Sequence, residues 1–375
     1  MQGQWIGKYQ GSNSGTAVVD LDDFGDHLEG NAYVFDDDPK LPGTLAFVRT
    51  VDQSPKQTLE LRLTPLHPFT GDILPREQLP EIAPGVFHPE TATATFEIKG
   101  NTLIVSWTTS VGTTGVAALA KSRSAEPSDY APEDSVKSWD QFKAHASSIE
   151  PERFVFRGQG TTHRLRTAFH RSKRKDLIRF MNQDIPTLHQ ILSARTKHLF
   201  NLNDPQHNAA FYNLVQHHGY PTPLLDWTRS PFVAAYFAFR TDRVPRDAND
   251  ETVRVFMFDS TAWRNDFNQI LKVTFARPHF SLLHALAIEN DRAIPQQALS
   301  SVTNLDDIES YIRQREAENQ KRYLRVFDIP RAEREAVLRD LRMMGITAGS
   351  MFPGFDGACE EIRTRLFGND RVAVA

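Results

Sequence analysis

Polar and ionisable side chains gather in one stretch of the chain, residues 213–240, that is otherwise strongly apolar. Its sequence is NLVQHHGYPTPLLDWTRSPFVAAYFAFR. Neither a structural helix nor a surface loop requires adjacent histidines, three prolines and an aspartate among so many large apolar residues. Buried polar groups must be hydrogen-bonded, and perturbed ionisable groups cluster at functional sites. We therefore expect a site here, and its candidate residues are Gln216, His217, Thr222, Asp226, Thr228 and Ser230.

The second half of this stretch has the composition of an anion-binding turn. Thr228 and Ser230 lie two residues apart, so on an extended segment their side chains share one face. Ser230 followed by Pro231 is typical of a helix N-cap with proline in the first helical position. The two hydroxyls and the helix N-terminus would together form an anion or ribose pocket. A helix cap within a buried polar network is the alternative.

Arg157, in the sequence FRGQ (156–159), is a second candidate. An arginine between an apolar strand and a glycine can hold a phosphate or carboxylate through two parallel hydrogen bonds. Gly158 would let a ligand approach the backbone closely. The alternative is a structural ion pair, because Asp226 needs a partner such as Arg157 or a histidine if it is buried.

A third and weaker candidate is the segment 290–301, NDRAIPQQALSS, which follows an expected strand. It contains Arg292, Gln296 and Gln297.

Several common chemistries lack support in the sequence. The single cysteine, Cys359, excludes an internal disulfide and a multi-thiolate zinc cluster, and we expect it to be a small core residue. HExxH, GxSxG, P-loop and GxGxxG motifs do not occur. We predict no metal site. The remaining histidines of the region are expected to be polar surface residues; these are His163, His170, His189, His198 and His207.

The elements that would position these residues belong to the second of two expected domains, since 375 residues exceed one ordinary core. Residues 1–121 contain short alternating segments between turn residues, including a hairpin signal at Gly100-Asn101. They predict an antiparallel β-barrel or sandwich, which is either a binding, sensing or docking module or a structural cap. Residues 122–137 are rich in Ser, Pro and acids, as in a linker.

Residues 138–375 predict an α+β domain. Strands are expected at 153–158, 224–228, 253–259, 280–289 and 323–329, with helices between them. Phe232, Tyr236 and Phe239 recur at helical spacing, and we interpret this stripe as core packing.

The charges are unevenly distributed along the chain. The net charge is −4, yet residues 1–130 hold nine Lys/Arg against seventeen Asp/Glu, a balance of −8. Nine basic residues lie within 153–179. This basic run would attract RNA or DNA, or would be a solvated helix face. The sequence contains no apolar run of roughly 18 residues, so it predicts no membrane span. The first residues, MQGQWIGKYQG, do not resemble a secretion signal. We expect a cytoplasmic protein.

Five sequence motifs, in this order, resemble the FRG-domain family over roughly residues 138–368. The matching sequences are FRGQ (156–159), L-x-T-x-x-x-R (165–171), QHHGYPTPLLDWTRSP (216–231), R-x-x-x-QQ (292–297) and GITAGSMFPGFDGACEEI (345–362). The layout also resembles that of ADP-ribosyltransferases. These enzymes place an arginine on a first strand, a Ser/Thr-x-Ser motif on a second, and a glutamate motif on a later strand.

This resemblance implies roles for individual residues. Arg157 would hold the phosphate or ribose of NAD, Thr228 and Ser230 would brace the nicotinamide ribose, and Gln297 would orient the ribose hydroxyl or the acceptor. His217 or Asp226 would position NAD or the attacking group. Further NAD-binding residues would be Gly158, Gln159, Gln216, Thr222 and Arg292.

The sequence departs from the transferase pattern at the third position. Transferases use a glutamate there to stabilise the developing oxocarbenium ion, and Gln297 is neutral. Glu289 or Asp291 would be the substitute. The leading hypothesis is an NAD-dependent ADP-ribosyltransferase that modifies a nucleic acid or protein as a toxin or anti-phage defence effector. The alternatives are a non-catalytic nucleotide- or nucleic-acid-binding module and a nucleotide hydrolase using His217 and Asp226. A protein partner is expected for the N-terminal β-domain.

Overall fold

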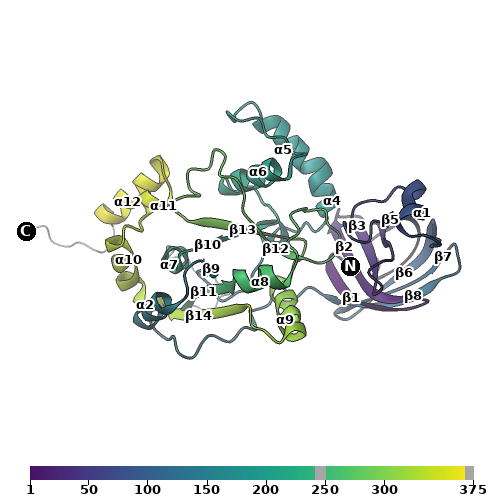
Figure 1. Cartoon of the computed structure of the whole chain (residues 1–375), viewed down its shortest axis with the longest axis horizontal. Helices are drawn as coiled ribbons and strands as arrows, with labels where there is room; N and C mark the ends of the chain where they lie inside the picture. The colour runs from purple at the N-terminus through teal and green to yellow at the C-terminus, as the bar shows by residue number, and fades with distance from the viewer. Residues whose placement is uncertain (241–250, 368–375) are drawn as a thin grey trace, which may run out of the picture.

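The computed structural model describes residues 1–240 and 251–367, which form two parts lying side by side (Figure 1). The first part, within residues 1–121, is a closed antiparallel barrel in which each strand pairs with the next and β1 pairs with β8. Its strands are β1 (Gly3–Gly11), β2 (Ser14–Asp23), β3 (Leu28–Asp36), β4 (Gly43–Arg49), β5 (Lys56–Leu66), β6 (Thr91–Lys99), β7 (Thr102–Thr109) and β8 (Thr114–Lys121). The predicted antiparallel barrel or sandwich is thus confirmed as a barrel.

The barrel interior follows from the two-residue alternation of its strands. In β6, whose sequence is TATATFEIK, Ala92, Ala94 and Phe96 are buried while Thr91 and Thr93 are exposed. The same alternation in the other strands directs apolar side chains inward. One core cluster therefore fills part of the lumen.

The second part is built on an antiparallel sheet with the strand order β12-β13-β10-β9-β11-β14. Its strands are β9 (Phe154–Gln159), β10 (Leu224–Thr228), β11 (Thr252–Asp259), β12 (Phe280–Leu283), β13 (Ala298–Thr303) and β14 (Leu324–Pro330). Together with its helices it confirms the predicted α+β domain. The central strands β9 and β10 carry the two main candidate motifs.

Helices cover both faces of this sheet. Alternate residues of β11 enter two cores: Val255 and Met257 pack with α2, α7 and α10, whereas Phe256 and Phe258 pack with α8 and α9. These helices are α2 (Trp139–Ser148), α7 (Pro231–Phe239), α8 (Ser260–Asp266), α9 (Ile308–Asn319) and α10 (Arg334–Met343).

A third apolar cluster joins the helices between β9 and β10 to the sheet. They are α3 (Ala168–Arg171), α4 (Leu177–Arg179), α5 (Ile185–Leu192) and α6 (Pro205–His217). The remaining helices are α1 (Leu79–Ile82) in the barrel, and α11 (Ala348–Met351) and α12 (Phe355–Phe367) at the end of the described chain.

Helix α7 begins as the sequence predicts. Ser230 is its N-cap and accepts a hydrogen bond from the Val233 backbone N–H, and Pro231 follows. Tyr236 and Phe239 are buried in the core, which confirms the interpretation of the aromatic stripe as packing.

The barrel docks on the C-terminal domain through buried polar contacts. The Gln4 amide donates to the Asn304 carbonyl oxygen at 2.8 Å, and Asn31 donates to Asp176 at 2.9 Å. Asp22, 2 % exposed as a side chain, accepts from Arg174 at 2.8 Å. These hydrogen bonds and this ion pair hold the barrel against the C-terminal domain.

Four expectations about local structure were wrong or incomplete. The strand expected at 280–289 ends at Leu283, and β8, β13 and α8 had no clear signal in the sequence. Cys359 is exposed, not a core residue, and His170 is buried, not at the surface. Among the described residues, no helix combines the length and hydrophobicity needed to cross a membrane.

Candidate functional site

A cavity of about 330 Å³ opens in the C-terminal domain beside β9 and β10. Six elements or connections contribute to its wall: β9, β10, the end of α6, α7, and the segments just before β13 and after α11. Its lining residues are Phe156, Arg157, Gly158, Gln216, His217, Asp226, Trp227, Thr228, Ala234, Phe237, Arg292, Gln296, Ala298 and Phe352. The structure therefore gathers most of the predicted site residues in one place.

Arg157 lies on β9, the strand between β10 and β11. Its Nη1 donates to the main-chain oxygen of Asp226 at 2.8 Å, and its Nε lies 3.5 Å from Gln159 Oε1. Both acceptors are uncharged, so the structural ion pair with Asp226 that we considered is not formed. Burial lowers the pKa of Arg157 to about 10, and the nearby Arg171 adds to this effect. The nearby Asp226 carboxylate acts in the opposite direction on this pKa. Arg157 therefore stays cationic at neutral pH.

Arg292 supplies a second guanidinium group on the cavity wall. Its Nη1 donates to the His217 carbonyl oxygen at 3.1 Å, and its guanidinium carbon lies 5.2 Å from the ring centre of Phe352. Phe352 packs edge-on against Phe237 with 6.0 Å between ring centres. One side of the cavity thus combines an aromatic wall with a positive charge.

Asp226 is the acidic residue in the cavity lining. The Gln216 side-chain nitrogen donates to Asp226 Oδ1, and the Thr222 hydroxyl donates to the side-chain oxygen Oε1 of Gln216. Thr222 is fully buried and does not line the cavity. Gln216 and Thr222 therefore hold the carboxylate in one orientation, a different role from the NAD contact expected of Thr222.

His217 occupies the last position of α6. Its Nδ1 lies 2.7 Å from the Asn213 carbonyl oxygen, which makes Nδ1 the protonated nitrogen and leaves Nε2 as a hydrogen-bond acceptor. Burial lowers the pKa of His217, although the Asp226 carboxylate acts in the opposite direction. The imidazole is therefore neutral at pH 7 and can accept a proton.

The hydroxyl of Thr228 and that of Ser230 have structural partners. Thr228 donates to the Gln296 main-chain oxygen at 2.7 Å, which ties β10 to the segment before β13. Ser230 caps α7 and, unlike Thr228, does not line the cavity.

Gln297 also lies outside the lining residues, and its neighbour Gln296 lines the cavity instead. The backbone of Gln297 is left-handed, with φ 47°, and its side chain is exposed. Gln296 is buried and donates to the Met351 carbonyl oxygen at 2.8 Å. Arg157, Ser230 and Gln297 are the residues expected to match the three transferase motifs. Of these three, only Arg157 lines the cavity.

Gly158 and Gln159 serve the scaffold. A Cβ atom built on Gly158 would lie 1.8 Å from the Ala234 main-chain oxygen, so the glycine is required by the close approach of α7 to β9. Gln159 donates to the His163 carbonyl oxygen at 2.9 Å. Glu289 and Asp291, the expected substitutes for a catalytic glutamate, are exposed and do not line the cavity.

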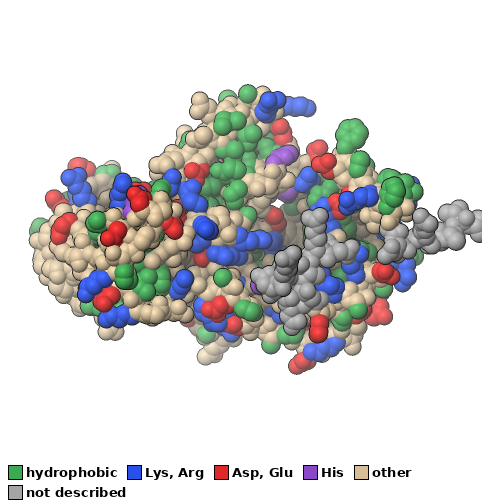
Figure 2. Space-filling model, turned by 180° about the vertical axis from the view of Figure 1, so that it is seen from behind, with side chains coloured by type: hydrophobic (Ala, Val, Ile, Leu, Met, Phe, Trp, Pro, Cys, Tyr) green, Lys and Arg blue, Asp and Glu red, His purple; other side chains and the backbone are tan. Residues whose placement is uncertain are grey.

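Several arginines of the basic run 153–179 pair with acidic residues of the protein. Arg153 contacts Asp259 and Arg166 contacts Asp306, at 2.8 and 2.6 Å. Arg164, 1 % exposed as a side chain, is held by carboxylates on both sides. Figure 2 shows Lys and Arg side chains across the middle of one face, with Asp and Glu among them. The basic run is thus largely part of the scaffold.

Sequence reasoning missed Phe237 and Phe352 as cavity residues. It named Gln296 in the third candidate segment but assigned the role to the neighbouring Gln297. Phe237 lies within the aromatic helix that was interpreted as core packing. The motif at 345–362 contains Phe352, so the resemblance offered a signal for it, but its chemistry gave none.

Comparison with protein families supports the resemblance seen in the motifs. The family described as FRG domain matches residues 152–247, so the C-terminal part of the chain contains an FRG domain. The matched range includes Arg157, Gln216, His217, Asp226 and Thr228. The remaining cavity residues on the segments before β13 and after α11 lie beyond it.

No curated protein matches the chain. Two solved structures of redesigned beta barrels match about a third of the chain: mFAP1 bound to DFHBI, at 14% identity, and b11L5F_LGL, at 9%. Each match covers 32% of this chain and 94% or 91% of the other chain, with a TM-score of 0.22. Similarity at this level supports no argument about this protein.

Proposed function

We propose that the C-terminal domain is an NAD-dependent ADP-ribosyltransferase whose NAD site is the cavity beside β9 and β10. One observation carries the proposal. Arg157, the Asp226–Thr228 segment and Gln296 come from β9, β10 and the segment just before β13, and they line the same cavity. The resemblance to ADP-ribosyltransferases assigned Ser230 and Gln297 to the second and third positions; in this proposal their neighbours Thr228 and Gln296 take those places.

The cavity offers the contacts that the nicotinamide half of NAD needs. Arg157 and Arg292 carry two positive charges against the single carboxylate of Asp226, so an anionic ligand is favoured. They would hold the diphosphate. Phe237 and Phe352 would pack against the nicotinamide ring. A volume of about 330 Å³ lies at the lower end for ligand pockets, so the adenosine would extend toward the opening.

The transfer step has a defined set of bonds. The bond between C1′ of the ribose and the nicotinamide nitrogen breaks, and its electron pair leaves with nicotinamide. The acceptor nucleophile forms a new bond to C1′ and loses a proton, which His217 Nε2 would accept. The fixed carboxylate of Asp226 would stabilise the positive charge that develops on the ribose, in the role first assigned to Glu289 or Asp291.

The acceptor is a nucleic acid or a protein. The internal ion pairs of Arg153, Arg164 and Arg166 leave fewer free cations for nucleic acid than the sequence suggests. This favours a protein acceptor. A toxin or defence role would follow from transfer to an essential acceptor.

Nicotinamide release from NAD tests the proposal. Purified full-length protein is incubated with labelled NAD, alone and with RNA, DNA or a protein mixture, and both free nicotinamide and acceptor-bound label are measured. We expect Arg157→Ala and Asp226→Asn each to lower release by about a hundredfold. Arg195→Ala, at an exposed position far along the sequence from the cavity lining, is the matched control and should change nothing.

The same assay separates the alternatives. Equal release by the wild-type protein and by Arg157→Ala overturns the transferase. NAD binding without release, measured by calorimetry, would establish a non-catalytic nucleotide-binding domain. That alternative draws on the Asp226 carboxylate already accepting a hydrogen bond from Gln216. Release without labelled acceptor would identify a hydrolase.

A further inference from the structure

The N-terminal barrel contains a second cavity, of about 230 Å³, inside its lumen. An eight-stranded barrel encloses a space that side chains fill or that holds one small ligand. Here the inward positions carry small residues on four strands, so the lumen is not filled. These small residues are Ala17, Ala32, Ala46, Ala92 and Ala94. A purely structural barrel would gain stability from larger side chains at these positions, because unfilled space in a core lowers stability.

The cavity lies at one end of the barrel. In an antiparallel barrel alternate turns fall on the same end, and the turns after β1, β3 and β7 all supply lining residues, among them Asn13, Leu41 and Thr113. The loop before β6 also reaches this end. Its Phe87 lines the cavity while remaining 87% exposed, as a side chain at an entrance would be.

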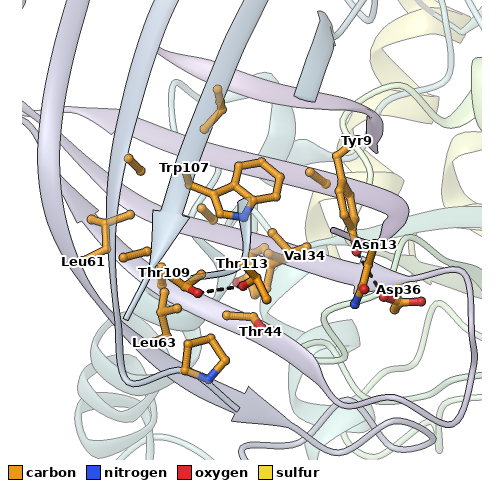
Figure 3. A pocket seen from close by; sticks show the side chains of 18 of the residues that line it. Tyr9, Asn13, Val34, Asp36, Thr44, Leu61, Leu63, Trp107, Thr109 and Thr113 are labelled. Carbon is orange, nitrogen blue, oxygen red and sulfur yellow. Dashed lines mark hydrogen bonds between the residues drawn. The ribbon is translucent and has the colours of Figure 1, made fainter. Parts of the chain in front are cut away.

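The inner wall is aromatic and the rim is polar. Figure 3 shows Trp107 and Tyr9 within the space enclosed by the strands, with Asn13, Asp36 and Thr113 among the labelled polar residues around it. Tyr9 and Trp107 meet edge-on with 5.4 Å between ring centres. This arrangement suits a flat ring inside the barrel with a hydrogen-bonding group at the rim.

The charge of the lining selects against anions. No Lys or Arg lines this cavity, whose residues all lie in the described part of the chain, and Asp36 is its acidic residue. His88 adds no positive charge at neutral pH, because burial and the nearby Arg76 lower its pKa to about 4. A phosphate or carboxylate would meet the Asp36 carboxylate, and the nearby Arg76 and Arg277 guanidinium groups do not line the cavity.

We propose that the barrel binds one small aromatic molecule, neutral or cationic, in the cavity lined by Tyr9, Trp107 and Asp36. Its ring packs against the aromatic wall, and its polar group lies at the rim. An apolar cavity of roughly 150 Å³ accommodates benzene, so this one fits a compound of one or two fused rings. The proposal is independent of the activity of the C-terminal domain.

Isothermal titration calorimetry of the full-length protein tests this site. The probes are 2-naphthol, 1-naphthylmethylammonium and 2-naphthalenesulfonate, which share a two-ring body and differ in charge. We expect the neutral and cationic probes to bind at least about tenfold more tightly than the sulfonate. Asp36→Asn should reduce this preference for the cation over the anion.

Two substitutions on one strand provide a matched pair. Ala94→Leu fills the lumen from β6 and should weaken 2-naphthol binding by about tenfold or more. Thr93→Leu adds the same side chain on the exposed outer face and should leave binding within about twofold. Ala46→Leu, on β4, repeats the test if Ala94→Leu does not fold, as judged by near-ultraviolet circular dichroism.

Three outcomes overturn the proposal: no probe binds the wild-type protein, the sulfonate binds most tightly, or the lumen-filling and outer-face variants bind 2-naphthol equally.

Discussion

Replacing Gly158 by alanine distinguishes two explanations for the glycine of the FRGQ sequence. The first holds that the glycine lets a ligand approach the backbone. The second holds that it lets α7 pack against β9. A Cβ atom at this position would lie 1.8 Å from the Ala234 main-chain oxygen and 2.7 Å from the Ala238 nitrogen. Since both are backbone atoms, no side-chain rotation relieves the clash.

The cost follows from this geometry. Contacts of a Cβ below 3.0 Å essentially never occur, so the Ala234 oxygen must retreat by at least 1.2 Å, the difference between 3.0 and 1.8 Å. Helix α7 lies in the largest core cluster of the domain, with Ala234, Ala235 and Ala238 fully buried. Overpacking of a close-packed core typically costs 1–3 kcal/mol, and here we expect about 3 kcal/mol or more.

Urea denaturation of the full-length protein measures this cost. Gly85→Ala is the comparison variant. Gly85 has φ +77° and no atom within 4 Å of its Cβ position, so its substitution carries only a left-handed backbone penalty of about 1 kcal/mol, which Gly158 does not share, and no steric clash. The double variant Gly158→Ala with Ala234→Gly should not recover stability, since the clash is with the main chain. A Gly158→Ala protein of normal stability that has lost NAD binding would refute the packing explanation and support ligand approach.

Three further predictions concern polar groups. Burial lowers the pKa of His279 to about 3, so below pH 6.5 protons bind the unfolded chain preferentially and the free energy of unfolding falls. In urea denaturation, His279→Gln should remove about 2 kcal/mol of the stability loss between pH 7 and pH 5, and an unchanged loss would contradict this. Asp22→Ala removes the buried carboxylate that pairs with Arg174 across the interface. It should lower the free energy of unfolding by about 3 kcal/mol in the same assay, and a decrease below about 1 kcal/mol would contradict this. If the transferase proposal holds, Gln216→Ala frees Asp226 and should lower kcat on the order of tenfold with little change in KM; an effect on KM alone would assign Gln216 to binding.

The elements with strong local signals were predictable from the sequence. The alternating strands of the barrel, the N-cap at Ser230 and the apolar strands around Arg157 and Asp226 follow from side-chain periodicity and turn chemistry. Strand β8 has the sequence TGVAALAK, which is rich in small residues and gives no such signal. It is defined by a tertiary contact, the pairing with β1 that closes the barrel.

Details of the site depend on tertiary geometry that no local pattern encodes. Gln296 and Gln297 are identical in type, and only the left-handed turn at Gln297 decides which one is buried at the cavity. Phe352 reaches the cavity from a segment far along the chain. Arg157 lines the cavity, yet its neighbour Gly158 serves packing, because the sequence cannot say which backbone approaches a glycine.

The position of the interface bears on whether the barrel is only a structural cap. Its buried polar contacts use Gln4 at the start of β1, Asp22 at the end of β2 and Asn31 near the start of β3. In the barrel these three positions share one end, opposite the turns that surround the lumen cavity. The packing continues along the barrel wall, where Ala276 joins a cluster of barrel residues, and Lys272 pairs with Asp72 after β5. Phe87 at the entrance is still 87% exposed. A structural cap needs this docking surface but does not need an alanine-lined lumen with an accessible entrance. The arrangement is therefore better explained by a barrel that admits a ligand from solvent beside Phe87 while it is docked on the C-terminal domain.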